Sequence, residues 1–575
     1  MKRKFVQIAA LCLSAVLLVL PCAAPADAVS ANAGNPIIRV GLHYGTGTME
    51  GLNMENVVGS GYRFGYYDGS NQFVPLGSTW QEKISVVETM NVYYGTYNSY
   101  TSYHTALTSS SVAVGEYHLQ LPGSYATFDE AQAAASVYGG GFPAYIGGVF
   151  YARIGSYTNR DRAVAAQSEL SAQGVWTELC GTSAYGVSVV VTGTNNMVFQ
   201  YDDLGGGTGL GVEPIAAGGE KAVTLSKGCR YYGGFRFERI NGGRMTVVNI
   251  IHLEDYVKGV VSTEMSSGWP LEALKAQAVA ARSYALSLGT KHGAHHFDIC
   301  FDTDCQAYSG LNRAGADTDA AVDQTAGQVA LYNGKPIEAF FYACSGGASE
   351  TPANVWGSSQ SYPYLVGKAD PYEASAPIPS YSWTRSFSAD TLASKLRALG
   401  YNVSGTIVSV AVTALTDSGN PRLVSFTDSA GKSYPVTSSN VIQKMLYLPS
   451  YRYGFDTVST SAPTPSLSIN GTTSVNSTAG LYAIDGNGNI AAVDSAAYVI
   501  TDSGISQAGQ GSTDLGDLGS LSSTTGSGGM FTFVGKGSGH NVGMSQWGAY
   551  AMAQQGYTYM DILQFYYTGI TVGYM

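Results

Sequence analysis

The chain has 575 residues, a net charge of −11 and only 12% charged residues, against about 25% in an average globular protein. The negative net charge excludes a nucleic acid duplex or an anionic membrane surface as the main partner. With 41 Tyr and 72 Gly, the low charge also excludes intrinsic disorder, which requires high charge and few aromatic residues. The length predicts about two to four domains.

Residues 1–28 are predicted to be a secretory signal peptide. Lys2, Arg3 and Lys4 precede the apolar run Phe5–Leu20, and small residues near Ala28 offer a cleavage site. A retained membrane anchor is the alternative, because this run nearly spans a bilayer. We therefore expect an exported protein that contacts a membrane only through an uncleaved signal.

Cysteines outside the signal peptide are few and odd in number: Cys180, Cys229, Cys300, Cys305 and Cys344. An odd number in an exported protein requires at least one free thiol or metal ligand. The chain is therefore not a disulfide scaffold.

Residues 36–114 are predicted to be a β-rich N-terminal segment that belongs to the same domain as residues 193–455 and 531–575. An internal repeat follows in residues 115–192, where His118–Ser136 is echoed by Phe150–Ser168. Each unit alternates like a strand, turns at Gly-Ser-Tyr and runs into an Ala-rich helix, which predicts a small βαβα domain. This stretch resembles the SPOR (sporulation-related repeat) domain, and the resemblance implies binding of glycan strands stripped of their peptides. The alternative is a generic α+β packing module.

The remaining chain divides into three parts. Residues 193–455 are predicted to be the core of the catalytic domain, with a hairpin over 228–250. Residues 456–530 are a Ser/Thr/Gly-rich insert or linker. Residues 531–575 return to an ordered, aromatic-rich motif. The whole chain is predicted to be α+β.

The densest chemical pattern lies between His252 and Gly289, where two helical segments are separated by a break at 266–268. Glu264 ends the first segment among apolar residues. Burial among such residues raises the pKa of a carboxyl, as a general acid requires. From the spacing alone, a Glu paired with a Lys or Arg at a helix end is the alternative. Lys275 and Arg282 lie two turns apart on one face of the second helix.

Several long motifs now follow in order: YVKGVVSTEM, PLEALKAQAVAARSYAL, FDICFDTDCQAYSG, ACSGG, VWG and GSGHNVGMSQWGAYAMAQQG. Together they resemble the stage II sporulation protein D/LytB family over residues 228–455 and 531–575, with PIIRVGL near residue 40. The resemblance implies a mixed α/β catalytic domain and lytic transglycosylation of peptidoglycan. It also implies that Glu264 is the catalytic acid and that Lys275 and Arg282 act near the groove.

Lytic transglycosylation needs one carboxyl and no cofactor. The acid protonates the oxygen between N-acetylmuramic acid and N-acetylglucosamine, and the C6 hydroxyl then closes onto C1 to give a 1,6-anhydro sugar. A hydrolase would instead need a second carboxylate. The candidates for that role are Glu254, Asp255, Glu272 and Glu338.

The segment between His292 and Cys305 offers ligands for a structural zinc, because thiolate and imidazole suit that ion. The preferred ligands are His296, Cys300 and Cys305, with Asp304 or another His as the fourth. The resemblance supports this prediction, since some family members carry a metal here, although Asp304 replaces their His. A Cys300–Cys305 disulfide is the alternative outside the cell.

Two further motifs are assigned by the resemblance to the substrate groove. Ser345 and Gly346 in ACSGG are expected to contact substrate. In GHNVGMSQWG, Gly permits close backbone approach, and amide and hydroxyl groups suit N-acetyl sugars. The residues expected there are His540, Gly543, Ser545 and Gln546.

The sequence therefore predicts a secreted, wall-associated lytic transglycosylase with a second module that binds the strand being cut. Its expected partners are peptidoglycan glycan strands and a cell-wall amidase. A non-catalytic peptidoglycan-binding amidase enhancer is the alternative, and a structural surface protein is a third hypothesis.

Overall fold

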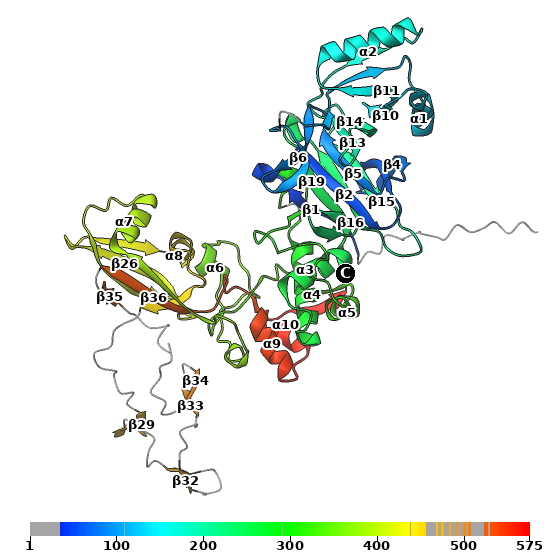
Figure 1. Ribbon diagram of the computed structural model, residues 1–575. Coiled ribbons are helices and arrows are strands. Elements are labelled where there is room, and N and C mark those ends of the chain that lie inside the picture. The colour runs from blue at the N-terminus through cyan, green and yellow to red at the C-terminus, as the bar shows by residue number, and fades with distance from the viewer. Residues whose placement is uncertain are drawn as a thin grey trace, which may run out of the picture.

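The computed structural model describes residues 35–107, 110–289, 291–437, 439–455, 523–526 and 529–574, with six short strands between 467 and 507. The predicted signal peptide and most of the predicted 456–530 insert lie outside the described residues. The described part is α+β, as predicted (Figure 1). None of its helices is long and apolar enough to cross a membrane.

A seven-stranded sheet carries the N-terminal strand next to the predicted hairpin. Its order is β20-β1-β19-β18-β15-β3-β4, and β1 pairs antiparallel with β19, with Val40 opposite Asn249. Strand β1 thus pairs directly with β19, and the helix that contains Glu264 begins where β19 ends. The bounds are β1 (Ile37–His43), β3 (Tyr62–Tyr67), β4 (Phe73–Thr79), β15 (Leu210–Pro214), β18 (Gly234–Glu238), β19 (Thr246–His252) and β20 (Ile299–Cys300).

A ten-stranded sheet crosses the rest of this body in the order β12-β9-β11-β10-β14-β13-β5-β2-β16-β17. A small sheet, β7-β6-β8, lies beside it. The bounds are β2 (Gly51–Val58), β5 (Lys83–Glu88), β6 (Val92–Tyr97), β7 (Tyr100–His104), β8 (Ala113–Val114), β9 (Tyr117–Gln120), β10 (Gly141–Ile146), β11 (Val149–Tyr157), β12 (Glu178–Cys180), β13 (Val187–Val191), β14 (Met197–Asp202), β16 (Val223–Ser226) and β17 (Cys229–Tyr231).

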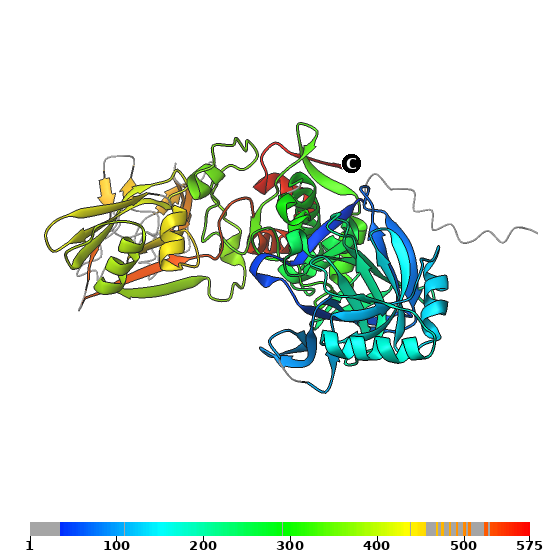
Figure 2. The same cartoon turned by 90° about the horizontal axis from the view of Figure 1, so that it is seen from above.

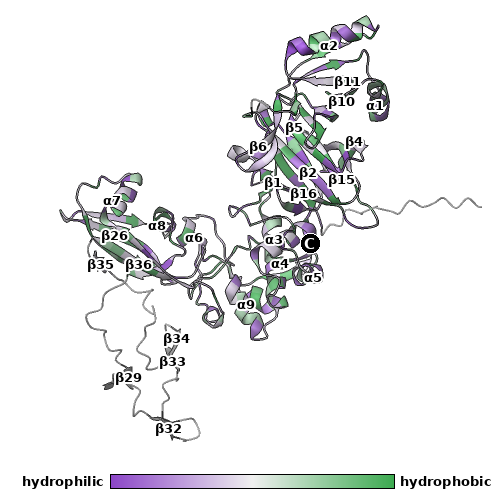
Figure 3. Cartoon of the chain, viewed as in Figure 1, coloured by the Kyte–Doolittle hydropathy of each residue, from purple (hydrophilic) through white to green (hydrophobic). Residues whose placement is uncertain are grey.

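Residues 115–192 form βαββαββ rather than the predicted βαβα, because a strand follows each helix and β13 ends the range. Each Ala-rich helix, α1 (Phe128–Ser136) or α2 (Arg160–Ala172), is followed by one more strand, β10 or β12. The side chains of Thr127 and Asn159 cap these helices, which explains where each begins. The module is not a separate sheet, because β10 pairs in parallel with β14. Its outer helix α2 begins with hydrophilic residues and alternates hydrophilic and hydrophobic residues further along (Figure 3).

A layer of helices below the sheets contains Glu264, Lys275, Arg282 and Gln546. The predicted break separates α3 (Leu253–Glu264) from α4 (Leu271–Ser287), and α4 is buried nearly all round because its many Ala side chains allow close packing. Around α4 lie α5 (Ala316–Gln324), α9 (Gln546–Gln554), α10 (Tyr559–Tyr566), β21 (Gln328–Tyr332), β22 (Lys335–Pro336) and β38 (Thr571–Tyr574). The connecting segments contain β23 (Phe341–Tyr342), α6 (Pro352–Trp356), β37 (Met544–Ser545) and the 3-10 turns η1 (Gly45–Gly47), η2 (Ile240–Gly242), η3 (Gly293–His295) and η4 (Glu373–Ser375).

A second lobe, residues 382–455 with 523–536, has its own hydrophobic core, which includes Leu396, Val410 and Phe533. Figure 2 shows it to one side of the main body. The predicted core over 193–455 therefore contains two packed units. The lobe consists of β24 (Ser382–Ser388), α7 (Ala389–Ala398), β25 (Ile407–Leu415), β26 (Pro421–Asp428), β27 (Ser433–Thr437), α8 (Ser439–Leu446), β28 (Arg452–Phe455), β35 (Ser523–Thr525) and β36 (Met530–Lys536). The short strands pair as hairpins: β29 (Leu467–Ile469) with β30 (Thr473–Val475), β31 (Tyr482–Ile484) with β32 (Ile490–Ala492), and β33 (Tyr498–Thr501) with β34 (Gly504–Gln507).

Candidate active site

Glu264 is the last residue of α3, and its carboxyl is only partly exposed. Its Oε1 accepts the Ala307 backbone N–H at 3.0 Å, and its Oε2 accepts the Gln546 side-chain amide at 3.0 Å. Burial raises the pKa of Glu264, while these two hydrogen bonds act in the opposite direction. The helix C-terminus also disfavours a negative charge at this position. A carboxyl held this way is suited to give up and take back a proton.

Gln546 joins two motifs that lie far apart in the sequence. It is the first residue of α9 and is buried, with 6% of its surface exposed. The preceding Ser545 caps this helix, because its hydroxyl accepts the Gly548 N–H at 3.0 Å. The structure thus brings Gln546 to Glu264 through the start of α9.

An aromatic cluster of Trp269, Trp547 and Tyr550 lies beside these residues in the chain. The ring centroids are 4.5 Å apart for Trp269 and Trp547, 5.2 Å for Trp269 and Tyr550, and 5.3 Å for Trp547 and Tyr550. All three side chains are partly exposed. Rings with an apolar face and a polar edge suit sugar binding. Trp269 was not predicted as a site residue, although its position shortly after Glu264 was an available signal.

Lys275 and Arg282 were expected near the groove. In the structure both side chains form ion pairs with glutamates of α3 and α4. Arg282 has no exposed side-chain surface and pairs through two nitrogens with Glu254, at 2.8 and 2.7 Å. Lys275 pairs with Glu272 at 2.7 Å, and the other oxygen of Glu272 accepts the Tyr559 N–H at the start of α10. One helical face therefore holds α4 to α3 and α10, and Arg282 is not brought to the Glu264 carboxyl.

Ser345 and Gly346, expected to contact substrate, turn inward. Both backbone N–H groups and the Ser345 hydroxyl donate to the buried carboxyl of Glu373. Gly346 has φ of 80°, and a Cβ there would lie 2.6 Å from the Lys536 carbonyl oxygen. Their polar groups are therefore used inside the fold, because Glu373 needs the donors.

His540 and Gly543, in the second expected groove motif, also have internal roles. The His540 ring lies against Tyr342 and Trp356, with centroids 5.5 and 5.3 Å away, and burial lowers its pKa to about 4. Gly543 has φ of 84°, and a Cβ there would lie 2.0 Å from the Phe340 carbonyl oxygen. The glycine is thus required by chain packing, and neutral His540 lines the same region.

Each candidate second carboxylate already has a partner. Glu254 and Glu272 hold Arg282 and Lys275, as described above. Asp255 pairs with Lys221 at 2.7 Å, and Glu338 accepts the Gln360 amide at 3.3 Å. The pKa of Glu264 is shifted by burial and by its hydrogen bonds from Gln546 and Ala307, not by a second carboxyl.

A candidate metal centre lies near β20, where one ligand atom each of His292, Cys300, Asp304 and Cys305 falls within 4.8 Å of the others. His292 Nε2 is 3.3 Å from Cys305 Sγ. A hydrogen bond from Cys300, with help from His292, lowers the pKa of the Cys305 thiol to about 6. Two sulfurs, an imidazole and a carboxylate fit tetrahedral zinc.

The structure differs from the prediction in which His joins this cluster. His296 has φ of 62°, so the chain reverses there, and its Nδ1 lies 2.8 Å from Glu238 instead. Cys300 and Cys305 are both free, as are Cys180, Cys229 and Cys344.

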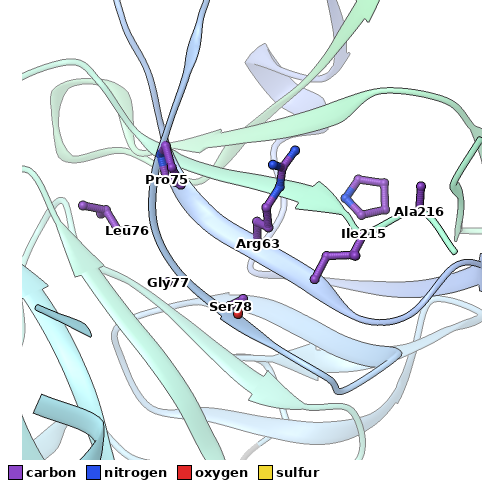
Figure 4. Close-up of a pocket in the computed structure, with 8 residues that line it drawn as sticks. Arg63, Pro75, Leu76, Gly77, Ser78, Ile215 and Ala216 are labelled. Carbon is purple, nitrogen blue, oxygen red and sulfur yellow. The ribbon is translucent and has the colours of Figure 1, made fainter. Parts of the chain in front are cut away.

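A cavity of about 660 Å³ lies elsewhere, on β3, β4 and β15 (Figure 4). Its charged side chain, Arg63, is paired with Glu213 at 2.6 Å. The remaining lining is Pro75, Leu76, Gly77, Ser78, Pro214, Ile215 and Ala216. This lining offers no proton donor or nucleophile comparable to Glu264.

Comparison with known proteins points to the same region. A family model described as Stage II sporulation protein matches residues 241–332, which contain α3 and α4. The chain is 33% identical over 365 residues to an uncharacterised protein of Brachyspira hyodysenteriae, covering 63% of this chain and 77% of that one. It is 32% identical over 316 residues to the amidase enhancer of Bacillus subtilis (55% and 40%) and 27% identical over 340 residues to the stage II sporulation protein D of Bacillus amyloliquefaciens (56% and 75%).

Proposed function

Because this chain belongs to the stage II sporulation protein D family, we propose that it is an exported peptidoglycan lytic transglycosylase. It cuts the bond between N-acetylmuramic acid and N-acetylglucosamine in glycan strands. The names of its relatives, which include an amidase enhancer, support a role in the cell wall during sporulation.

The observation that carries this proposal is the Glu264 carboxyl. It is partly buried, has a raised pKa and is held by one amide side chain and one backbone N–H. A raised pKa increases the protonated fraction of a carboxyl at a given pH, which favours action as a general acid. The hydrogen-bond partners of Glu264 are the Gln546 amide and the Ala307 N–H, and neither is a second carboxyl. This favours a reaction that needs only one carboxyl.

The reaction proceeds without water. Protonated Glu264 gives its proton to the glycosidic oxygen, and the bond from that oxygen to C1 of N-acetylmuramic acid breaks. The C6 hydroxyl oxygen of the same sugar bonds to C1, and its proton returns to Glu264. The products are a free 4-hydroxyl on N-acetylglucosamine and a 1,6-anhydro sugar. Intramolecular attack is favoured because the reacting groups are already close.

Two other parts of the chain hold the strand in this proposal. The aromatic cluster of Trp269, Trp547 and Tyr550 stacks against sugars near Glu264. Residues 115–192, which resemble a SPOR domain, bind strands from which an amidase has removed the peptides. Binding at two places on one strand increases overall affinity without new contacts.

Zinc has a structural part in this proposal. His292, Cys300, Asp304 and Cys305 would hold it, and it would supply a rigid link between the segment after α4 and β20. Catalysis by Glu264 requires no cofactor.

Mass spectrometry of peptidoglycan digests tests the function. Peptide-stripped and intact peptidoglycan are incubated with wild type, Glu264→Gln and the surface control Glu82→Gln, which replaces an exposed carboxyl just before β5. We expect fragments ending in 1,6-anhydro-N-acetylmuramic acid from wild type and Glu82→Gln, and none from Glu264→Gln.

Other products would change the assignment. Fragments with reducing ends would indicate hydrolysis and refute the transglycosylase reaction. No fragments, together with tight strand binding and faster cleavage by an added amidase, would favour the non-catalytic amidase enhancer.

A further inference from the structure

Glu373 is a fully buried carboxyl that gathers donors from both groove motifs. It lies at the start of η4 and has no exposed surface. It accepts the Ser345 hydroxyl at 2.9 Å, the Gly346 N–H at 3.0 Å and the Ser345 N–H. It also accepts the Ser545 hydroxyl at 2.5 Å. The ACSGG loop and the start of α9 therefore meet on one side chain.

The Ser545 hydroxyl passes this interaction on to the helix. A hydroxyl has one proton, and the short bond directs it to Glu373, which leaves the lone pairs for the Gly548 N–H at 3.0 Å. This cap sets where α9 begins. The next residue, Gln546, donates to Glu264 Oε2 at 3.0 Å.

We propose that Glu373 is a positioning residue for the Glu264 carboxyl, acting through Ser545 and Gln546. This inference rests on the proposed function. Glu373 itself touches neither the reacting atoms nor Glu264.

An ionised carboxylate suits this position, because five groups donate to it: the Ser345 and Gly346 N–H groups and the hydroxyls of Ser345, Ser545 and Tyr381, the last at 3.5 Å. An amide or a protonated carboxyl has fewer acceptor sites and would weaken or lose at least one of these bonds. The groups that face Glu373 are Asp370, Tyr342, Cys344, Tyr381 and Arg452, with Tyr566 bound to Asp370 at 2.6 Å. Burial and Asp370 raise the pKa of Glu373 to about 7, so the ionised form depends on these donors.

The expected readout is the pKa of Glu264. The Gln546 amide stabilises the charged form of Glu264, so losing its position raises that pKa. A general acid must be protonated, and the alkaline limb of kcat/KM then moves to higher pH. A residue that only stabilises the fold would lower activity without moving this limb.

The test compares Glu373→Gln, Ser545→Ala and Gln546→Met with wild type. We expect each to lower kcat about tenfold to a hundredfold and to move the alkaline limb up by about one pH unit. The double variant Glu373→Gln/Gln546→Met should lose no more than the worse single variant, because both act on one bond. Ser545→Thr keeps the hydroxyl and should restore both readouts.

The matched control is Glu88→Gln, another buried carboxyl that accepts a backbone N–H, from Met245 at 2.9 Å. It should lower thermal stability and leave the limb in place. If Glu373→Gln and Ser545→Ala behave like Glu88→Gln, the positioning role is refuted.

A second measurement separates this inference from the proposed function. The pKa of Glu264 is followed by NMR titration of carbon-13 glutamate side chains, with Glu264→Gln identifying the signal. An inactive wild type in which Ser545→Ala still raises this pKa would refute the transglycosylase and support the positioning role. An unchanged pKa in an active enzyme would refute the positioning role alone.

Discussion

Replacing Arg282 by Met tests whether this residue supports the fold or the substrate. The Arg282 guanidinium is completely buried, bonds twice to Glu254 and donates to the Gln328 carbonyl at 2.9 Å. Met fills a similar volume but leaves the Glu254 carboxyl, whose side chain is 17% exposed, with the Gly327 N–H at 3.1 Å. Removing one partner of a buried pair costs about 3–5 kcal/mol.

Differential scanning calorimetry measures this cost. At about 2–4 °C per kcal/mol for a domain of this size, Arg282→Met should lower the Tm of the main body by about 10 °C. The Tm of Arg282→Lys should lie between those of wild type and Arg282→Met, because a Lys ammonium cannot bond both Glu254 oxygens as the planar guanidinium does. The control is Arg63→Met, since Arg63 is 52% exposed in its pair with Glu213 and such pairs contribute about 1 kcal/mol or less. A variant Arg282→Met with wild-type Tm and no glycan cleavage would refute the structural role.

Three further predictions concern other parts of the chain. Zinc titration followed by elemental analysis should load wild type and His296→Ala equally, whereas Cys305→Ser should lose the ion; equal loading of all three would contradict the proposed ligands. Glu350 is a buried carboxyl of the main body that accepts hydrogen bonds from Thr416 at 2.5 Å and Asn420 at 3.0 Å of the second lobe. Glu350→Ala should lower the free energy of unfolding by about 1–3 kcal/mol and speed proteolysis between the lobes. Unchanged proteolysis would argue against a role of Glu350 in joining them. Burial lowers the pKa of His118 from 6.5 to about 4, so the neutral ring contributes about 3 kcal/mol to stability that is complete above pH 6.5 and lost as pH falls toward 4. The free energy of unfolding in urea should therefore depend less on pH for His118→Phe than for wild type. An equal pH dependence of the two proteins would contradict this prediction.

Local sequence patterns were sufficient for several features. The α3–α4 break follows from Ser266, Ser267 and Gly268, and the β-rich character of residues 36–114 was also predicted. The apolar neighbours of Glu264 are adjacent in sequence, so its partly buried setting could be predicted. Each of these depends on contacts within a few residues.

Other features could not be read from the pattern. The repeat in residues 115–192 predicted the helices but not the strands after them, because β12 is short and β10 finds its partner β14 only in the sheet. The second lobe was hidden for a related reason, since β36 joins its core only after the long insert.

The roles of the site residues were decided by tertiary packing. Periodicity places Lys275 and Arg282 on one face of α4, where Lys275 pairs with Glu272 one turn earlier on the same helix. Only the packing of α3 against α4 brings Glu254 to Arg282. A left-handed residue at His296 removes its ring from the thiols and leaves His292 beside them. The hydrogen-bond donors to Glu373 come from the segments around Ser345 and Ser545, which are far apart in sequence, so no local spacing predicts them. Buried polar groups must find partners wherever the fold supplies them, and so the sequence alone determined the elements and Glu264, while the tertiary structure decided what each charged group binds.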